Sequence, residues 1–213
     1  KITGSDDGYK SPTDMGVNRA GFAIVDDEAC KEAAKQEIIR RYLIAKCSYR
    51  KGTIDESILE RCQLLMEEVG ATKYDRPAVK EAEDYVEVKK AQNPQRYENV
   101  VVAAIEMPDG KIITGRSSRR MVASAAAVLN ALKYLAGIQD EMMIISPTIF
   151  ESMTNTKVGI FHDKSSLNLE EVIMALTLTK LTNPIAELAL NQLKNLDGCV
   201  GHCTAILSDK DEQ

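Results

Sequence analysis

Residues 100–114 read VVVAAIEMPDGKIIT, and this stretch decides the fold class. Its first half is rich in β-branched and small apolar residues, the tripeptide Pro108-Asp109-Gly110 favours a turn, and residues 111–114 return to β-branched side chains. The pattern predicts a β-hairpin. Residues 121–136 follow as a helix that is apolar nearly all round, which indicates a buried position. We therefore expect a helix packed on a sheet.

The sequence after this helix predicts more elements of both kinds. Asn168 with Glu171 has the spacing of a helix cap, and Pro184 favours the first turn of a further helix. The expected elements are a buried strand at 141–145, helices at 168–181 and from 184, and a final strand at 199–207. They predict an α/β (α+β) fold in which a layered mixed sheet carries helices on its faces.

The residues before this part predict helices. Apolar side chains recur at three- and four-residue spacing over 27–50, and Thr53 with Glu56 has the spacing of a capping box for a second helix. The composition then changes at the tripeptide Asn93-Pro94-Gln95. We predict a mainly helical lobe over residues 1–96 and an α/β lobe over residues 97–213.

Composition excludes several classes of protein. A chain of 213 residues with 44% hydrophobic content can bury a core, and its apolar runs are far shorter than the roughly 20 residues of a membrane span. The net charge of −5 argues against a nucleic-acid partner, which needs a concentrated basic face. Five cysteines, an odd number, indicate reduced thiols, and no stretch has the order of a signal peptide. We expect a cytoplasmic protein that binds neither nucleic acid nor membranes.

The opening segment, residues 9–18, is dense in polar residues with positional meaning, and the chain has no initiator Met. A helix start accounts for part of it, with Ser11 as cap, Pro12 in the first turn and Asp14 reaching back. Capping leaves the other polar residues unexplained. As candidate ligand-binding or interdomain residues we select Lys10, Ser11, Thr13, Asp14 and Asn18. We interpret them as one side of a contact with a segment that precedes this chain.

Residues 110–117 spell G-x-x-x-x-G-R-S, one residue from a phosphate loop. The intervening residues predict a strand rather than a turn, and Arg116 replaces the lysine, so we regard the match as accidental. A second hypothesis is an anion site at a helix N-terminus, where free N–H groups and the dipole favour negative charge. Its candidate residues are Arg116, Ser117, Ser118 and Arg119, with Arg120 beside them. Ordinary capping with solvated arginines is the alternative.

Cys199, His202 and Cys203 are the strongest candidates for metal ligands. A zinc ion needs its two sulfur ligands within roughly 4 to 5 Å, whereas residues four apart on a strand are separated by roughly 13 Å. His202 would also face the opposite side of that strand. We therefore predict buried thiols and no metal site.

His162 and Asp163, beside Ser165 and Ser166, contain the ingredients of a nucleophilic triad. Adjacent residues on a loop rarely achieve the geometry of a proton relay, so we expect a surface loop. A basic run also stands out, formed by Arg40, Arg41, Lys46, Arg50 and Lys51. Solvation and the helix dipole explain these cations, and a contact surface for an acidic or phosphorylated partner is the alternative.

The sequence carries the runs YKSPTDMGVN at 9–18, EAAKQEIIRRY at 32–42, SAAAVLNALK at 124–133 and TNP at 182–184. In these runs it resembles the bacterial domain-of-unknown-function family eighteen-forty-six over nearly its whole length. The resemblance implies the C-terminal portion of a cytosolic bacterial protein of about twice this length or more. The missing N-terminal portion would carry its own α/β body with a phosphate-loop-like segment. No reaction is established for that family.

The hairpin and the helix ending in residues 129–132 are similar to the cytidine-deaminase-like fold. In that fold a His or Cys, an Ala and a Glu begin the helix, bind zinc and shuttle a proton. The matching positions here are Ala126, Ala127 and Val128, and the later Pro-Cys-x-x-Cys pair is absent. Because alanine cannot ligate zinc, the resemblance implies the topology without its zinc site.

Two functions stay open, and with them the question whether the chain is an enzyme. The first is a part of a nucleotide- or phosphate-dependent protein whose chemistry lies mainly in the missing N-terminal portion. It implies no cofactor within this chain, a nucleotide in the full-length protein, and the missing portion or a second copy as partner. The second is a non-catalytic scaffold or assembly domain with a degenerate deaminase-like fold.

Overall fold

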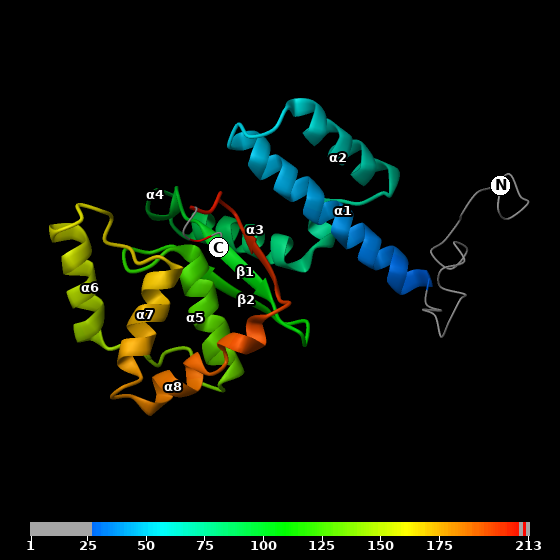
Figure 1. Cartoon of the computed structure of the whole chain (residues 1–213). Helices are drawn as coiled ribbons and strands as arrows, with labels where there is room; N and C mark the ends of the chain where they lie inside the picture. The colour runs from blue at the N-terminus through cyan, green and yellow to red at the C-terminus, as the bar shows by residue number, and fades with distance from the viewer. Residues whose placement is uncertain (1–26, 209–210, 212–213) are drawn as a thin grey trace, which may run out of the picture. The chain divides into compact units, whose positions relative to one another are not determined.

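The computed structural model describes residues 27–208 and residue 211 (Figure 1). The candidate residues of the opening segment lie outside this range: Lys10, Ser11, Thr13, Asp14 and Asn18. The chain divides into two compact units, of which one ends at Arg76 and the other begins at Pro77. The described residues form helices and one small sheet, so the predicted α/β class is confirmed.

The first unit contains a helical pair, α1 (Asp27–Arg50) and α2 (Glu56–Glu68), and the short helix η3 (Lys73–Asp75). Ile39, Met66 and Ala71 form its buried centre. The predicted capping box of Thr53 and Glu56 is wrong, because Glu56 is the first residue of α2 and Asp55 precedes it as cap. The Thr53 hydroxyl instead donates to the carbonyl of Ser48 over 3.0 Å, closing the turn after α1.

The second unit begins with helices and then forms the predicted hairpin. Its elements are α3 (Pro77–Gln92), α4 (Pro94–Tyr97), β1 (Val102–Glu106), β2 (Ile112–Arg116), α5 (Ala123–Leu135), α6 (Pro147–Gly159), α7 (Leu169–Thr179), α8 (Pro184–Leu190), η4 (Leu193–Leu196) and β3 (Val200–Cys203). The hairpin turn holds Gly110 at a φ of 81°, a backbone conformation that glycine adopts freely.

The sheet has the strand order β2-β1-β3, with both pairings antiparallel. Side chains of β1 alternate between its faces: Val102 and Ala104 pack with α3, whereas Ala103 packs with α5. The second unit therefore has a helix, a sheet and a helix as successive layers, as Figure 1 shows. The helix α3 packs on the sheet and belongs to the second unit, which begins at Pro77.

The described sheet is antiparallel rather than mixed, because the strand predicted at 141–145 does not form. Ile144 and Ile145 are buried, as the pattern predicts, but their segment is irregular. Short apolar runs do not distinguish a strand from other buried segments, which explains the error. The final strand is also shorter than predicted and spans Val200–Cys203.

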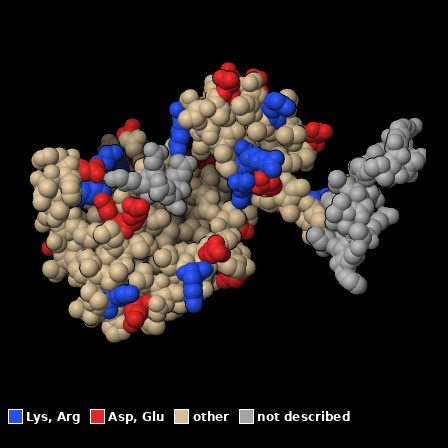
Figure 2. Space-filling model, viewed as in Figure 1, with Lys and Arg blue, Asp and Glu red and all other residues tan. Residues whose placement is uncertain are grey.

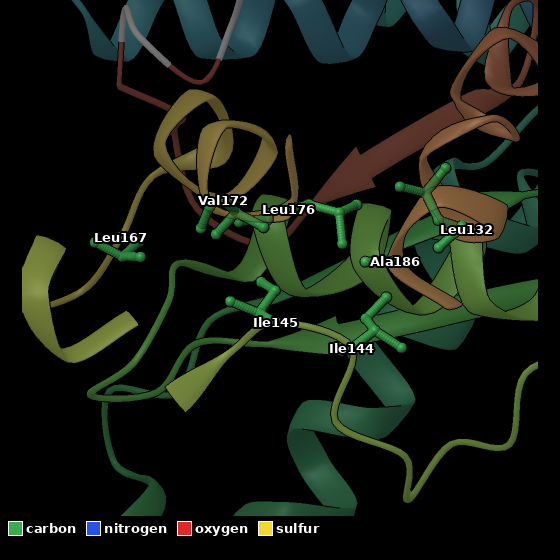
Figure 3. Close-up of a cluster of buried hydrophobic side chains, with 10 residues drawn as sticks. Leu132, Ile144, Ile145, Leu167, Val172, Leu176 and Ala186 are labelled. Atoms are coloured by element: carbon green, nitrogen blue, oxygen red, sulfur yellow. The ribbon is translucent and has the colours of Figure 1, made fainter. Parts of the chain in front are cut away.

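The largest core of the second unit lies between α5, α7, α8 and the segment before α6. Figure 3 shows side chains of this core from these elements and from the segment before α7, among them Leu132, Ile144, Leu167 and Leu176. On the face shown in Figure 2, basic and acidic side chains are interspersed. Among the described residues, no helix combines the length and the apolar character that crossing a membrane requires.

Candidate functional site

The N-termini of α5 and α7 lie next to each other because the segments before them pair. Val122 N–H donates to the carbonyl of Leu167 over 3.0 Å, and Leu167 N–H donates to the carbonyl of Arg120 over 2.8 Å. An open cavity of about 670 Å³ lies at these helix starts, and we call it the α5/α7 cavity. Its lining includes Ser117, Ser118, Ser124, Asn168 and Asp211.

Ala123 and Ser124, in the first turn of α5, are part of this lining. The first hydrogen bond within α5 runs from Ala126 N–H to the carbonyl of Val122 over 3.1 Å. The N–H groups of Ala123, Ser124 and Ala125 have no acceptor within the helix, as is true of the first donors of every α-helix. The positive end of the helix dipole adds to them, so the start of α5 favours an acceptor or an anion.

The start of α7 carries the capping box that the sequence predicts. The Asn168 side chain accepts from Glu171 N–H over 2.8 Å, and the Glu171 carboxylate accepts from Asn168 N–H over 2.8 Å. This prediction is confirmed. The first N–H of the helix, that of Leu169, is not part of the box and needs a separate acceptor.

Asp211 supplies that acceptor. Its Oδ1 accepts from Leu169 N–H over 3.0 Å and from the Ser124 hydroxyl over 3.4 Å. One carboxylate oxygen therefore contacts the first turns of both helices. The other oxygen accepts from the Ser208 hydroxyl over 2.6 Å. A negative group is thus already accommodated where two helix dipoles converge.

Lys157 is the buried cation of the α5/α7 cavity. Its Nζ lies 2.6 Å from the Glu171 carboxylate and 2.9 Å from the carbonyl of Ser166, and the Asp163 carboxylate is 3.8 Å away. The lysine charge is therefore matched by protein groups. Lys157 positions Glu171, and through it the cap of α7.

The four residues predicted as an anion site do not all meet. Ser117 and Ser118 line the α5/α7 cavity, where Ser117 Oγ accepts from Val101 N–H over 3.0 Å. The guanidinium of Arg116 lies over the ring of Tyr97, 5.6 Å from its centre. The exposed Arg119 contributes its carbonyl, which accepts from the Ser165 hydroxyl over 3.2 Å.

The remaining candidate motifs have other partners. The Ser165 hydroxyl donates to the carbonyl of Arg119, and the Asp163 carboxylate lies 3.8 Å from the Lys157 ammonium. In α1, Arg40 and Arg41 both bind the Glu37 carboxylate, over 2.6 and 2.8 Å. Hydrogen bonds to the two guanidinium groups lower the pKa of the Glu37 carboxyl from 4.5 to about 2, and the bond to Arg40 has the larger effect.

The three positions that match the zinc-site residues of the deaminase-like fold lie on α5. Ala126, Ala127 and Val128 lie in its first half, and none of them carries a metal-binding group. Within 27–208 and 211, no three His, Cys, Asp or Glu residues are grouped so that they could hold a metal ion. Cys203 packs with Ala103 and the buried face of α5, and burial raises the pKa of the Cys199 thiol.

Sequence reasoning did not select Lys157 or Asp211. Lys157 lies in α6, for which the sequence gives no clear helix signal, and a lysine alone does not indicate burial. Asp211 is far from Ser124 and Leu169 in the sequence, so only the fold brings them together.

Two family models match the chain. One is described as "Domain of unknown function DUF1846, C-terminal" and matches residues 74–213, and the other is described as its N-terminal domain and matches residues 1–70. The expectation of a C-terminal portion alone is therefore corrected, because the chain spans matches to both. The expectation of a family without an assigned function is confirmed.

Curated relatives from clostridia match the whole chain. A UPF0371 protein of Clostridium tetani (strain Massachusetts / E88) is 47% identical over 215 residues. A UPF0371 protein of Clostridium botulinum (strain Alaska E43 / Type E3) is 49% identical over 214 residues. Each match covers 100% of this chain and 42% of the relative, so the chain spans less than half the length of these relatives. Neither name states an activity.

Proposed function

Because the chain belongs to the DUF1846 family and spans 42% of the length of its relatives, we propose that it supplies one side of a larger protein's binding site for a phosphate-bearing ligand. A nucleotide is the ligand class that we favour. The chemistry lies mainly in the part of the relatives that this chain does not span. A cytosolic location belongs to the same proposal, and the free thiols of its cysteines favour a reducing compartment.

The contact of Asp211 with both helix starts carries this proposal. A carboxylate oxygen bonded to Leu169 N–H and to the Ser124 hydroxyl has the charge and the donors that a phosphate oxygen would have there. The α5/α7 cavity extends well beyond this carboxylate, with a volume of about 670 Å³. A phosphate group would replace Asp211 at these donors.

Other polar groups around the α5/α7 cavity are suited to the same ligand. Ser117, Ser118 and Ser208 line the cavity and carry hydroxyl groups that can donate hydrogen bonds. Lys164 also lines it and adds a positive charge that is exposed to solvent. Arg116 and Arg119 flank Ser117 and Ser118 in sequence. From the opening segment, this proposal retains Lys10, Ser11, Thr13, Asp14 and Asn18 as ligand-binding residues.

Calorimetric titration of ATP, ADP and inorganic phosphate into the full-length protein tests the proposal. Ser124→Ala removes a donor at the shared oxygen position, and we expect it to weaken binding about three- to tenfold, since a typical hydrogen bond contributes about 0.5–1.5 kcal/mol net. Asp211→Ala removes the competing carboxylate and should strengthen binding. Asp14→Ala and Asn18→Ala test the opening segment.

Asp84→Ala is the matched control for Asp211→Ala. Asp84 is an exposed aspartate of α3 outside the α5/α7 cavity, so its loss changes the net charge equally without freeing a donor. Equal affinities for both aspartate variants would mean that net charge, and not the cavity, governs binding. Failure of all three phosphate compounds to bind the full-length protein would contradict the proposal.

A second function, an assembly domain, is favoured by the exposed face of α7. Met174 and Leu178 lie one turn apart on α7, Leu181 follows its end, and the three side chains are 59%, 47% and 76% exposed. Apolar residues gathered in this way on a surface are typical of protein contacts. On this proposal the partner is a second copy of the chain.

Light scattering after size-exclusion chromatography tests the second function. Self-association that Leu178→Glu abolishes would support assembly through α7. Val88→Glu, at an exposed valine of α3, is the control, because it adds the same charge elsewhere. A monomeric protein at all concentrations would contradict this alternative without affecting the phosphate proposal.

A further inference from the structure

A second cavity of about 320 Å³ lies between α5, the segment before α6 and the start of α6. We call it the Lys133 cavity. Its wall is largely apolar, with side chains of Met121, Leu129, Met142, Ile144, Ile145 and Phe150. Neither the proposed phosphate site nor the capping of the helices uses these residues. The volume lies at the lower end of the roughly 300–1,000 Å³ that small-molecule sites occupy.

Lys133 is the buried charge in this apolar surrounding. The residue is 5% exposed, and its ammonium donates to the carbonyl oxygen of Asp140. Among the described residues, the carbonyl of Asp140 is the hydrogen-bond acceptor recorded for the Lys133 ammonium. An ammonium group has three N–H donors, so two more are available to acceptors in the cavity. A buried ammonium is costly without a counter-charge, which makes an anionic acceptor favourable here.

The other charges around the Lys133 cavity lie nearer to solvent. Asp140, Glu141 and Glu151 belong to the lining, but all three residues are exposed. Water and salt screen these carboxylates, whereas a charge paired with the buried ammonium is screened much less. Arg120, also exposed, lies over the ring of Phe150 at 6.0 Å and adds a second cation to the lining.

We propose that the Lys133 cavity binds a small molecule with an apolar body and a carboxylate. The carboxylate accepts hydrogen bonds from the Lys133 ammonium, and the apolar body contacts the methionine, isoleucine and phenylalanine side chains. Flexible methionines suit such a ligand, because they adapt their shape to an apolar chain. This site is separate from the α5/α7 cavity and does not depend on the phosphate proposal.

Octanoate, octan-1-ol and octylamine form a matched set of probes, because they share one apolar chain and differ in charge. Calorimetry with the full chain should show octanoate binding about tenfold more tightly than octan-1-ol, with octylamine weakest. Lys133→Met keeps most of the side-chain volume and removes the ammonium. It should bring the affinity for octanoate down to that for octan-1-ol or below.

Fluorescence locates the binding site independently of the lysine variant. The protein has no tryptophan, so Met143→Trp, at an exposed residue of the cavity lining, introduces a single reporter. Leu188→Trp is the control, since Leu188 is similarly exposed at 55% but lies on α8 outside this cavity. Octanoate should change the emission of the first variant and leave that of the second unchanged.

Three results would overturn the proposal. The first is equal or weaker binding of octanoate than of octan-1-ol to the unmodified chain, and the second is tightest binding of octylamine, which would mean that the exposed carboxylates dominate. The third is an emission change in Leu188→Trp alone. The order of the three probe affinities and the fluorescence of the tryptophan variants test the proposal even if Lys133→Met does not fold.

Discussion

Gly115 of β2 lies directly against the backbone of Ala127 in α5. A Cβ atom added at Gly115 would lie 2.0 Å from the backbone nitrogen of Ala127, far inside any tolerated contact. Ala127 is itself fully buried. The absence of a side chain at Gly115 therefore lets the helix that begins at the α5/α7 cavity pack closely on the sheet.

Gly115→Ala should lower the free energy of unfolding of the second unit by about 3 kcal/mol or more, because backbone atoms cannot move aside as a flexible side chain can. Gly201→Ala in β3 is the control, since the nearest atom to its added Cβ is 4.0 Å away. Urea unfolding followed by circular dichroism measures both. Equal stability of the two variants would contradict the close packing of β2 and α5.

Thr179→Val should destabilise the second unit by about 1–3 kcal/mol. Thr179 is buried, and its hydroxyl accepts from Ser146 N–H over 3.1 Å while donating to the carbonyl of Ala175 over 2.7 Å. Valine keeps the shape but leaves the Ser146 N–H without its acceptor. Thermal unfolding compares it with Thr177→Val, two residues earlier and exposed, for which we expect a change within about 0.5 kcal/mol.

Lys157 and Glu171 should show strong energetic coupling. Lys157→Met leaves the Glu171 carboxylate without its cation, and Glu171→Gln leaves a buried ammonium with less compensation. A double-mutant cycle from urea unfolding should give a coupling energy of about 1–3 kcal/mol. A coupling below about 0.5 kcal/mol would show that the pair does not position the cap of α7.

The stability of the first unit should depend on Glu37 in acid. The pKa of its carboxyl is lowered in the folded state from 4.5 to about 2, chiefly by Arg40. Folding therefore gains stability above pH 4.5, and this gain is lost as the pH falls toward 2. In an NMR titration, Arg40→Ala should raise the pKa of Glu37, whereas Lys46→Ala on the same helix should leave it unchanged.

The sequence predicts the hairpin and the cap of α7 correctly. The hairpin follows from a turn tripeptide between β-branched runs, and the capping box of α7 follows from Asn168 and Glu171. Both signals lie within a few residues, where turn and cap chemistry act directly. Residues 141–145 lack such a signal, and their apolar character alone wrongly indicates a strand.

The candidate cavities depend on contacts that span long distances in the sequence. The sequence places Ser117 and Ser118 near the start of a helix, and both residues line the α5/α7 cavity. Asp211 and Lys157 reach the same region only through the packing of α6 and α7 and the path of the chain after β3. The hydrogen bond of the Lys133 ammonium to the carbonyl of Asp140 likewise depends on the path of the chain after α5.

The two partners of β1 come from very different stages of synthesis. The hairpin with β2 can form once residue 116 has emerged from the ribosome, whereas β3 follows only at residues 200–203. Thr204 then bonds to Val102 from 102 residues away. Until that moment one edge of β1 has open backbone donors and acceptors. Two nascent chains on one messenger RNA can therefore pair with each other through this open edge before β3 is synthesised.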